Sequence, residues 1–506
     1  MLNKLTKTRQ CTGRKTQGLR FNPAFYFQRL PSALQHSVLY ASALILAKAL
    51  GFIMVPFSTY YLSLEDYGRL DVLQTLADLM SIVIAMGLTE TLYRYASGEA
   101  NSTQTSQDSY SVDQKQAAAN VFGLTLLIAI ATLMLTQSFA KYFSLWLPGN
   151  IAVTEARLIL ASISLGGLVI IPLSWFRIRD KAWQFFYASA AMAILQVSFA
   201  VLLLVLGFGV TGVLSATLLA ISLLAGYLIK VQLADTGIAF NFLLFKRYAR
   251  YGGPLVFVGI AGFILGSFDR WILAASIGTA SMASYALACK FGLLTAVLIQ
   301  PFDLWWHAKR FAFIKGDNGP QLCAKYAGIG VIIALFSALL MSVLGPVLVR
   351  LLSPSEYHSA VNYIPYLAFL ACLHSINNSL NLGMLNGETT WSVASVDAAA
   401  AVLALLGYFL LIPIYQAWGA ILATAIALTS RVVICYIISQ RYLFIPYRVK
   451  SLIVQSALTF IAIHWLSSPT WALKYFLLLT LLILLLVISA MWLRLIPRFF
   501  SADKQK

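Results

Sequence analysis

Residues 36–62 read HSVLYASALILAKALGFIMVPFSTYYL, an apolar run in which Lys48 is the single Lys or Arg and no acid occurs. A helix needs ~20 such residues to cross about 30 Å of hydrocarbon. The rest of the chain resembles this run, since 60% of its 506 residues are hydrophobic and only 11% are charged. Continuous apolar runs argue against a membrane β-barrel, whose short strands alternate in polarity. The sequence therefore predicts an all-α polytopic membrane protein.

Charged or Gly/Pro-containing breaks divide the apolar sequence into about 14 predicted transmembrane helices. The predicted ranges are 36–62, 71–96, 116–137, 152–176, 183–207, 209–232, 251–277, 281–307, 323–350, 360–386, 389–415, 417–442, 450–467 and 472–495. We expect the first twelve to form two six-helix lobes, to which two C-terminal helices are added.

An internal repeat supports the two lobes. Gly51–Leu62 (GFIMVPFSTYYL) aligns without gaps with Gly262–Leu273 (GFILGSFDRWIL), six predicted helices later. An even number of helices preserves orientation, so we expect a pseudo-twofold axis along the membrane normal and a cavity between the lobes. The predicted divisions are a basic N-terminal segment at 1–35, an N-terminal lobe at 36–232, a linker at 233–250, a C-terminal lobe at 251–442, and helices 13 and 14 with a basic tail at 443–506.

The net charge of +18 is explained by membrane topology. The segment before the first helix has seven cations and no acid, which by the positive-inside rule predicts a cytoplasmic N-terminus. Most of the 36 Lys and Arg then fall in cytoplasmic loops, and both termini lie in the cytoplasm. Attraction to anionic lipid accounts for the rest, without a nucleic-acid partner. An Arg-rich, acid-poor start is also typical of a mitochondrial presequence, but we favour a bacterial inner-membrane protein.

Four cations lie within predicted helices, where a central charge costs ~2.5–3.5 kcal/mol and usually faces protein or water. They are Lys48, Arg270, Lys290 and Arg431. A lumen lined by these cations suits an anionic headgroup, because Arg binds phosphate oxygens in pairs and Lys acts as a movable point charge. The alternative is that each cation has only a structural partner; Asp269 cannot face its neighbour Arg270 on the same helix and should pair with another helix.

Other polar residues within the helices suggest two further features. Asp78, Asp269 and Asp303 are candidate sites for a coupling H⁺ or Na⁺, because a buried carboxylate titrates or binds a cation. His374, Asn377, Asn378 and Asn381 have the spacing of one helical stripe and could bind sugar hydroxyls. Hydrogen bonding between helices explains the stripe equally well. Neither a zinc pattern nor a Walker, HExxH or nucleophile-elbow motif occurs, so we expect no metal, no cofactor and no enzymatic activity.

Two groups of residues carry a family resemblance. The first comprises Pro56, Tyr61, Leu62, Ser63, Glu65, Tyr67, Gly68, Gly87, Leu88, Arg94 and Tyr95, and the second comprises Asp269, Arg270, Tyr285, Ala288 and Lys290. Over residues 36–445 the chain resembles the polysaccharide-biosynthesis branch of the multidrug/oligosaccharidyl-lipid/polysaccharide (MOP) exporter superfamily.

The resemblance implies a flippase that moves a polyprenyl-pyrophosphate-linked oligosaccharide, such as an O-antigen repeat unit, from the cytoplasmic to the periplasmic leaflet. Its expected partners are this glycan, membrane lipids, a coupling H⁺ or Na⁺ and other polysaccharide-assembly proteins. A multidrug exporter of the same superfamily is the main alternative, and it predicts a lumen dominated by acids. A polysaccharide polymerase or ligase is a further alternative, but it would need a large external loop that this sequence lacks.

Overall fold

The computed structural model describes residues 32–96, 112–386 and 391–466, and these residues form helices joined by short connections. The N half contains α2 (Ser32–Tyr61), α3 (Leu64–Ser81), the π-helical turn η1 (Ile82–Met86), α4 (Gly87–Ala96), α5 (Val112–Trp146), α6 (Val153–Ile178), α7 (Ala182–Val205) and α8 (Gly209–Asp235). The C half contains α9 (Phe242–Gly266), α10 (Asp269–Ile277), α11 (Thr279–Ile314), α12 (Gly319–Leu352), the 3₁₀ helix η2 (Ser355–Asn362), α13 (Ile364–Leu380), α14 (Leu382–Leu385), α15 (Trp391–Tyr442) and α16 (Val449–Leu466). The predicted all-α fold is confirmed.

Nine of the described helices are long and apolar enough to cross a membrane, or up to eleven when each of two bent pairs counts as one span. Many of their large apolar side chains are exposed, including Phe257 and Ile414, as expected of surfaces that face lipid. The predicted helix at 472–495 lies outside the described residues. The chain is a multi-pass membrane protein, and the total of 14 helices stays a prediction.

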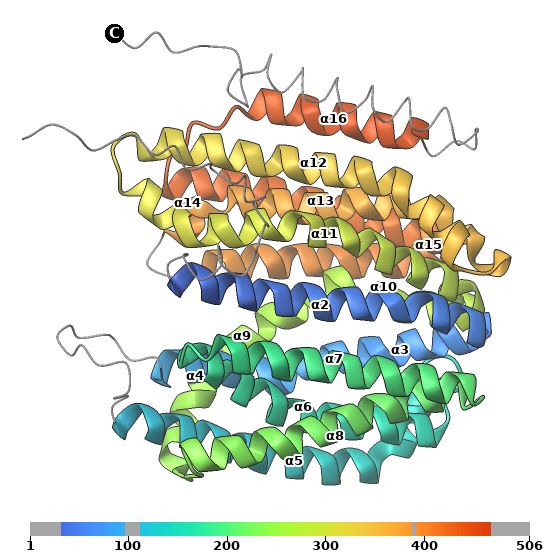
Figure 1. Cartoon of the computed structure of the whole chain (residues 1–506). Coiled ribbons are helices and arrows are strands. Elements are labelled where there is room, and N and C mark those ends of the chain that lie inside the picture. The colour runs from blue at the N-terminus through green and yellow to red at the C-terminus, as the bar shows by residue number, and fades with distance from the viewer. Residues whose placement is uncertain (1–31, 97–111, 387–390, 467–506) are drawn as a thin grey trace, which may run out of the picture.

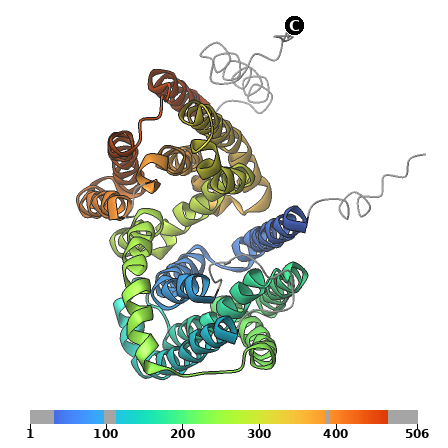
Figure 2. The ribbon, with the colours of Figure 1, turned by 90° about the vertical axis from the view of Figure 1, so that its left-hand side faces the viewer.

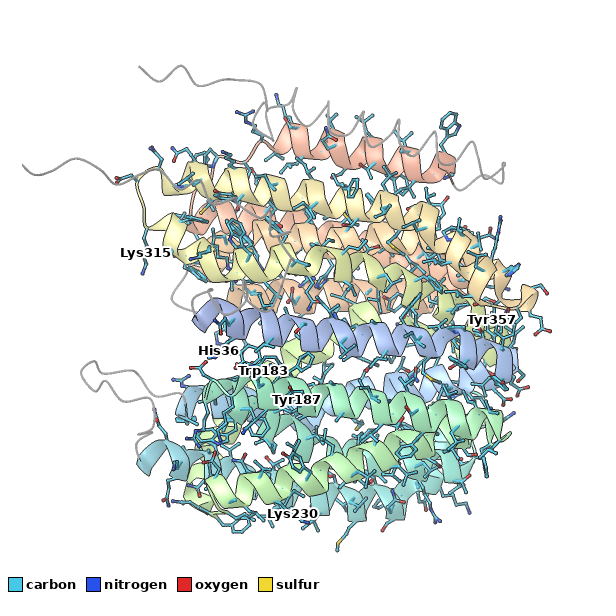
Figure 3. The ribbon with its side chains drawn as sticks, in the orientation of Figure 1. His36, Trp183, Tyr187, Lys230, Lys315 and Tyr357 are labelled. Carbon is cyan, nitrogen blue, oxygen red and sulfur yellow. The ribbon has the colours of Figure 1, made fainter. Side chains whose placement is uncertain are left out.

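The helices gather into two groups that correspond to the N half and the C half (Figures 1 and 2). Helix α9 crosses between them, because it packs against α4 and η1 on one side and against α15 on the other. Helix α3 packs against α11 and forms a second contact between the halves. In Figure 3, Lys315 marks one end of the helical bundle and Tyr357 the other, and we call these the Lys315 end and the Tyr357 end.

Helix α3 begins at Leu64, seven residues before the predicted start at 71. The Ser63 side chain accepts a hydrogen bond from the Asp66 backbone N–H and caps the helix. Glu65 and Asp66 lie in the first turn, where negative side chains stabilise the helix through its dipole. The predicted boundary is therefore wrong, because these acidic residues start the helix and do not precede it.

Two breaks in the helices have distinct backbone causes; the one near 416 was predicted, whereas the other interrupts the helix predicted at 251–277. The segment that repeats Gly51–Leu62 is not one continuous helix in the second half, because α9 and α10 are bent by 45° between Gly266 and Asp269. The predicted break between 415 and 417 lies at Gln416, whose φ of 53° and ψ of −128° are not helical. The two legs of α15 fold back on each other, and the Tyr408 hydroxyl lies 2.8 Å from the Thr424 hydroxyl.

Candidate substrate-binding site

A buried ionic cluster joins the two halves. Asp71 of α3 is 1% exposed, and its Oδ2 accepts a hydrogen bond from Arg270 Nη1 of α10 at 3.4 Å. The other oxygen, Oδ1, lies 3.7 Å from Lys290 Nζ of α11. Gln74 Oε1 accepts a hydrogen bond from Lys290 at 3.2 Å, and the lysine nitrogen lies 4.8 Å from the centre of the Tyr67 ring. We call these five residues the Asp71 cluster.

Local structure explains how the cluster forms. Tyr67, Asp71 and Gln74 have the spacing i, i+4 and i+7, which places them on one face of α3, towards α11. The bend between α9 and α10 puts Arg270 in the first turn of a new helix, where its Nη2 donates to the Gly266 carbonyl oxygen at 3.3 Å. This carbonyl belongs to the last turn of α9, where no helical partner remains for it.

Asp269 faces a different helix from Arg270, as the sequence predicted. Its Oδ2 accepts a hydrogen bond from the Tyr285 hydroxyl of α11 at 2.5 Å, and its Oδ1 accepts one from the Arg270 backbone N–H at 3.0 Å. Trp271 Nε1 donates to the Thr75 hydroxyl and thereby adds a further bond between α10 and α3. The start of α10 is thus fixed by bonds to both α3 and α11.

The N half contains two adjacent cavities. One, of about 240 Å³, is lined by Lys290 and by the polar side chains Ser58, Gln74, Gln196 and Thr217. The other, of about 360 Å³, extends towards the Lys315 end, where Arg177 contributes to its wall. The two cavities share Ala47, Ala193 and Gln196 as wall residues. In the part of the chain that the structure describes, each cavity is lined by a single cation and by no carboxylate.

A third cavity, of about 340 Å³, lies in the C half. Arg270 and Asp269 line it on one side, and Arg431 and Asp397 line it on another. Arg431 Nε donates to Asp397 Oδ1 at 2.7 Å, and Arg431 Nη1 lies 3.1 Å from His374 Nδ1. The charges of this cavity are therefore balanced, whereas those of the N-half cavities are positive.

The structure brings three of the four predicted cations to the cavities and gives each a carboxylate partner. Arg270 and Lys290 share Asp71, and Arg431 pairs with Asp397. Lys48 is exposed on α2, next to the wall residue Ala47, and its Nζ donates to Gln300 Oε1 of α11 at 3.0 Å. The assignment of these cations to a substrate lumen stays a prediction.

The predicted polar stripe is divided among different surroundings. His374 lines the C-half cavity, and Asn377 is buried. Asn378 is half-buried, and Asn381 lies beyond the end of α13, where its Oδ1 accepts a hydrogen bond from Arg310 at 3.3 Å. Only His374 of this stripe therefore lines a described cavity.

The predicted coupling carboxylates occupy three different places. Asp269 belongs to the C-half cavity, Asp78 is exposed on α3 two turns beyond Asp71, and Asp303 is half-buried on α11 towards the Lys315 end. Their role in coupling stays a prediction. Sequence reasoning gave Asp71 no role of its own, although its spacing from Tyr67 and Gln74 was a usable signal.

The fold is that of a multi-pass membrane transporter. Its two helical groups contain cavities, and buried charges lie between these cavities. The chain belongs to the polysaccharide biosynthesis protein family, whose sequence model matches residues 33–302. The resemblance to this branch of the MOP superfamily is thereby confirmed. The comparison with curated proteins gives no match.

Solved structures with similar folds come from the same superfamily. The lipid II flippase MurJ in an inward closed conformation is 14% identical, with a TM-score of 0.68, and the match covers 90% of this chain and 99% of that chain. A MATE transporter in complex with MaD3S is 14% identical, with a TM-score of 0.54 and coverage of 85% and 98%. A MOP superfamily transporter from Pyrococcus furiosus is also 14% identical, with a TM-score of 0.51 and coverage of 84% and 98%. At these identities the similarity concerns the fold.

Proposed function

We propose that this protein is a flippase that moves a polyprenyl-pyrophosphate-linked oligosaccharide, such as an O-antigen or related repeat unit, from the cytoplasmic to the periplasmic leaflet. It does so by alternating access and without enzymatic chemistry. Residues 36–232 and 251–442 act as the two moving lobes, joined by the linker at 233–250. Membership of the polysaccharide biosynthesis family supports this cargo class.

The observation that carries the proposal is the charge of the N-half cavities. Among the described residues, Lys290 is the only charged one in the lining of the first cavity, and Arg177 is the only charged one in the lining of the second. An exporter of cationic drugs would need carboxylates there, so the lining favours an anionic cargo over the multidrug alternative. A diphosphate linked to a glycan supplies both the negative charge and the hydroxyl groups that such a cavity can bind.

The lining residues suggest how the cargo lies. Its diphosphate binds Lys290 of the N-half cavity and Arg270, which lines the C-half cavity. Sugar hydroxyls find donors and acceptors on Gln74, Gln196 and Thr217 of the N-half cavity. The polyprenyl chain stays in lipid, and the two predicted C-terminal transmembrane helices, at 450–467 and 472–495, shape a groove for it. Helix α16, the described part of this pair, lies at the edge of the C half and exposes Ile453 and other apolar side chains (Figure 1).

We infer that the Lys315 end faces the cytoplasm of a bacterial cell and that both termini lie on that side. This orientation follows the positive-inside rule, since Lys181, Lys309, Lys315, Arg441 and Arg448 all lie in or next to the connections at this end. The membrane potential, worth ~2.3 kcal/mol per charge per 100 mV, then favours export of an anion and inward return of a coupling H⁺ or Na⁺. Asp78, Asp269 and Asp303 are the candidate sites for this ion.

Deletion of the gene in its native host tests the function. Surface polysaccharide should disappear while lipid-linked repeat units accumulate on the cytoplasmic leaflet, and the wild-type gene should reverse both effects. At equal protein levels, Lys48→Ala and Arg431→Ala should fail to do so. Normal surface glycan together with new sensitivity to cationic drugs would refute the flippase and support a multidrug exporter.

A further inference from the structure

The Asp71 cluster lies between the N-half cavity that contains Lys290 and the cavity of the C half. Lys290 lines the first and Arg270 lines the second, and the Asp71 carboxylate lies buried between the two cations. An anion that binds either cation from its own cavity therefore competes with Asp71. The cluster is both the meeting point of the two cavities and a bond between the two halves.

The contacts of Asp71 with the two cations are longer than the contact within the Arg431–Asp397 pair. Asp71 lies 3.4 Å from Arg270 and 3.7 Å from Lys290, whereas Arg431 and Asp397 are 2.7 Å apart. Charge-assisted hydrogen bonds normally measure about 2.7–2.9 Å. Within the described part of the chain, the buried atoms Asp71 Oδ1 and Arg270 Nε have no hydrogen-bond partner. Arg270 thus keeps an unused donor, Nε, for an anion with more oxygens than a carboxylate, and Lys290 lies 3.7 Å from Asp71, beyond hydrogen-bond distance.

The cluster lies one helical turn from the place where the halves close at the Tyr357 end. The Tyr357 hydroxyl donates to the Leu62 and Ser63 carbonyl oxygens, each at 3.3 Å, and its ring packs against Tyr67, with 5.5 Å between ring centres. Tyr67 is four residues before Asp71 on the same face of α3. Release of Asp71 would therefore loosen the same face of α3 that closes this end.

We propose that Asp71 is a resident counter-anion that holds the Tyr357 end closed until the diphosphate of the cargo replaces it at Arg270 and Lys290. Binding of the cargo and opening of the Tyr357 end then occur in one step, in which the diphosphate takes the place of the Asp71 carboxylate. This inference rests on the proposed function and adds a selection step, because a lipid or sugar without the diphosphate does not displace Asp71. The charge on the cargo, and not its size alone, gives access to the outward-open state.

Distances between spin labels across the Tyr357 end test this proposal. Thr154 of the N half and Ser359 of the C half are exposed at that end and can be replaced by labelled cysteines. The background carries Cys11→Ser, because the cysteines at 289, 323, 372 and 435 are buried. Label distances are measured in nanodiscs without ligand, with polyprenyl diphosphate, and with the uncharged polyprenol.

In wild type we expect polyprenyl diphosphate to raise the ratio of open to closed populations at least about fivefold, and polyprenol to leave it unchanged. Asp71→Asn should show a similar rise without ligand, and Asp71→Glu should stay closed. Asp66→Asn is the matched control, because it removes the same charge from the same helix but from a pair with Arg69 inside the N half. Lys290→Gln is the second variant, in case Asp71→Asn does not fold, and should open partly without ligand.

An Asp71→Asn population identical to those of wild type and Asp66→Asn overturns the proposal, even if wild type binds the diphosphate. An equal response of wild type to polyprenol also overturns it, because opening would then not depend on charge. Failure of the proposed function has a different signature. The wild-type gene would then not restore surface glycan to the deletion strain, whatever the label distances show.

Discussion

At Gly68, α3 lies against the backbone of Thr279 at the start of α11, and we predict that one added methyl group there forces the Tyr357 end open. A Cβ atom at Gly68 would lie 2.1 Å from the Thr279 carbonyl oxygen and 2.7 Å from its carbon. Both obstacles are backbone atoms, so no side-chain rotation relieves the contact. The two helices would have to separate by roughly 1 Å before the methyl group fits.

Overpacking of this kind costs about 1–3 kcal/mol. The cost applies only while the halves are closed, so in Gly68→Ala the ratio of open to closed populations should rise by a factor of about 5–150. The label pair at Thr154 and Ser359 measures this ratio without ligand. The control is Gly226→Ala on α8, where an added Cβ meets no atom within 4 Å.

Gly226→Ala should keep the wild-type distance distribution and gain slightly in thermal stability, because alanine favours the helix over glycine. A Gly68→Ala distribution that matches Gly226→Ala would refute the reasoning. It would mean that α3 and α11 accommodate the methyl group by a local shift, without opening between the halves.

Three further predictions concern stability in detergent, measured by thermal unfolding. Arg431→Met should lower the free energy of unfolding by about 3–5 kcal/mol, because it leaves Asp397 as an unpaired buried charge. The double variant Arg431→Met/Asp397→Leu should recover most of this loss, and a double variant no more stable than the single one would contradict the reasoning. Tyr285→Phe should lose about 1.5–3 kcal/mol because the hydroxyl donates to the Asp269 carboxylate, and an unchanged midpoint would show that this bond adds nothing. Gln416→Gly should raise the free energy of unfolding by about 1 kcal/mol, because the backbone angles at this position suit glycine better than glutamine. A lower unfolding midpoint would show that the backbone at 416 is not strained.

Intramembrane charges were predictable from the sequence because their cost does not depend on knowing the fold. A charge in an apolar run usually faces protein or water, and this argument alone identified four cations. Arg270, Lys290 and Arg431 line cavities, whereas Lys48 is exposed on α2. The helix break at Gln416 was equally visible, as an interruption between two apolar runs. Local signals of this kind survive in a single sequence.

Asp71 was overlooked for a physical reason. The predicted helix began at 71, which placed this carboxylate at the membrane edge, whereas Ser63 caps a helix that already contains it. The capping pattern of Ser63 and Asp66 was available as a signal. The pairing of Asp71 with Arg270 could not be predicted, because the two are 199 positions apart and only the tertiary fold brings them together.

Small residues in the wall of the N-half cavity that contains Lys290 leave room for substitution. Gly51 faces open space, with no atom within 4 Å of an added Cβ, and Ala47, Ala193 and Ala200 line the same cavity. A Cβ atom at Gly51 therefore meets no neighbour, and Gly51→Ala leaves Lys290 and Asp71 in place. Natural variation or laboratory evolution can therefore change the volume of this cavity one residue at a time while Lys290 and Asp71 stay unchanged.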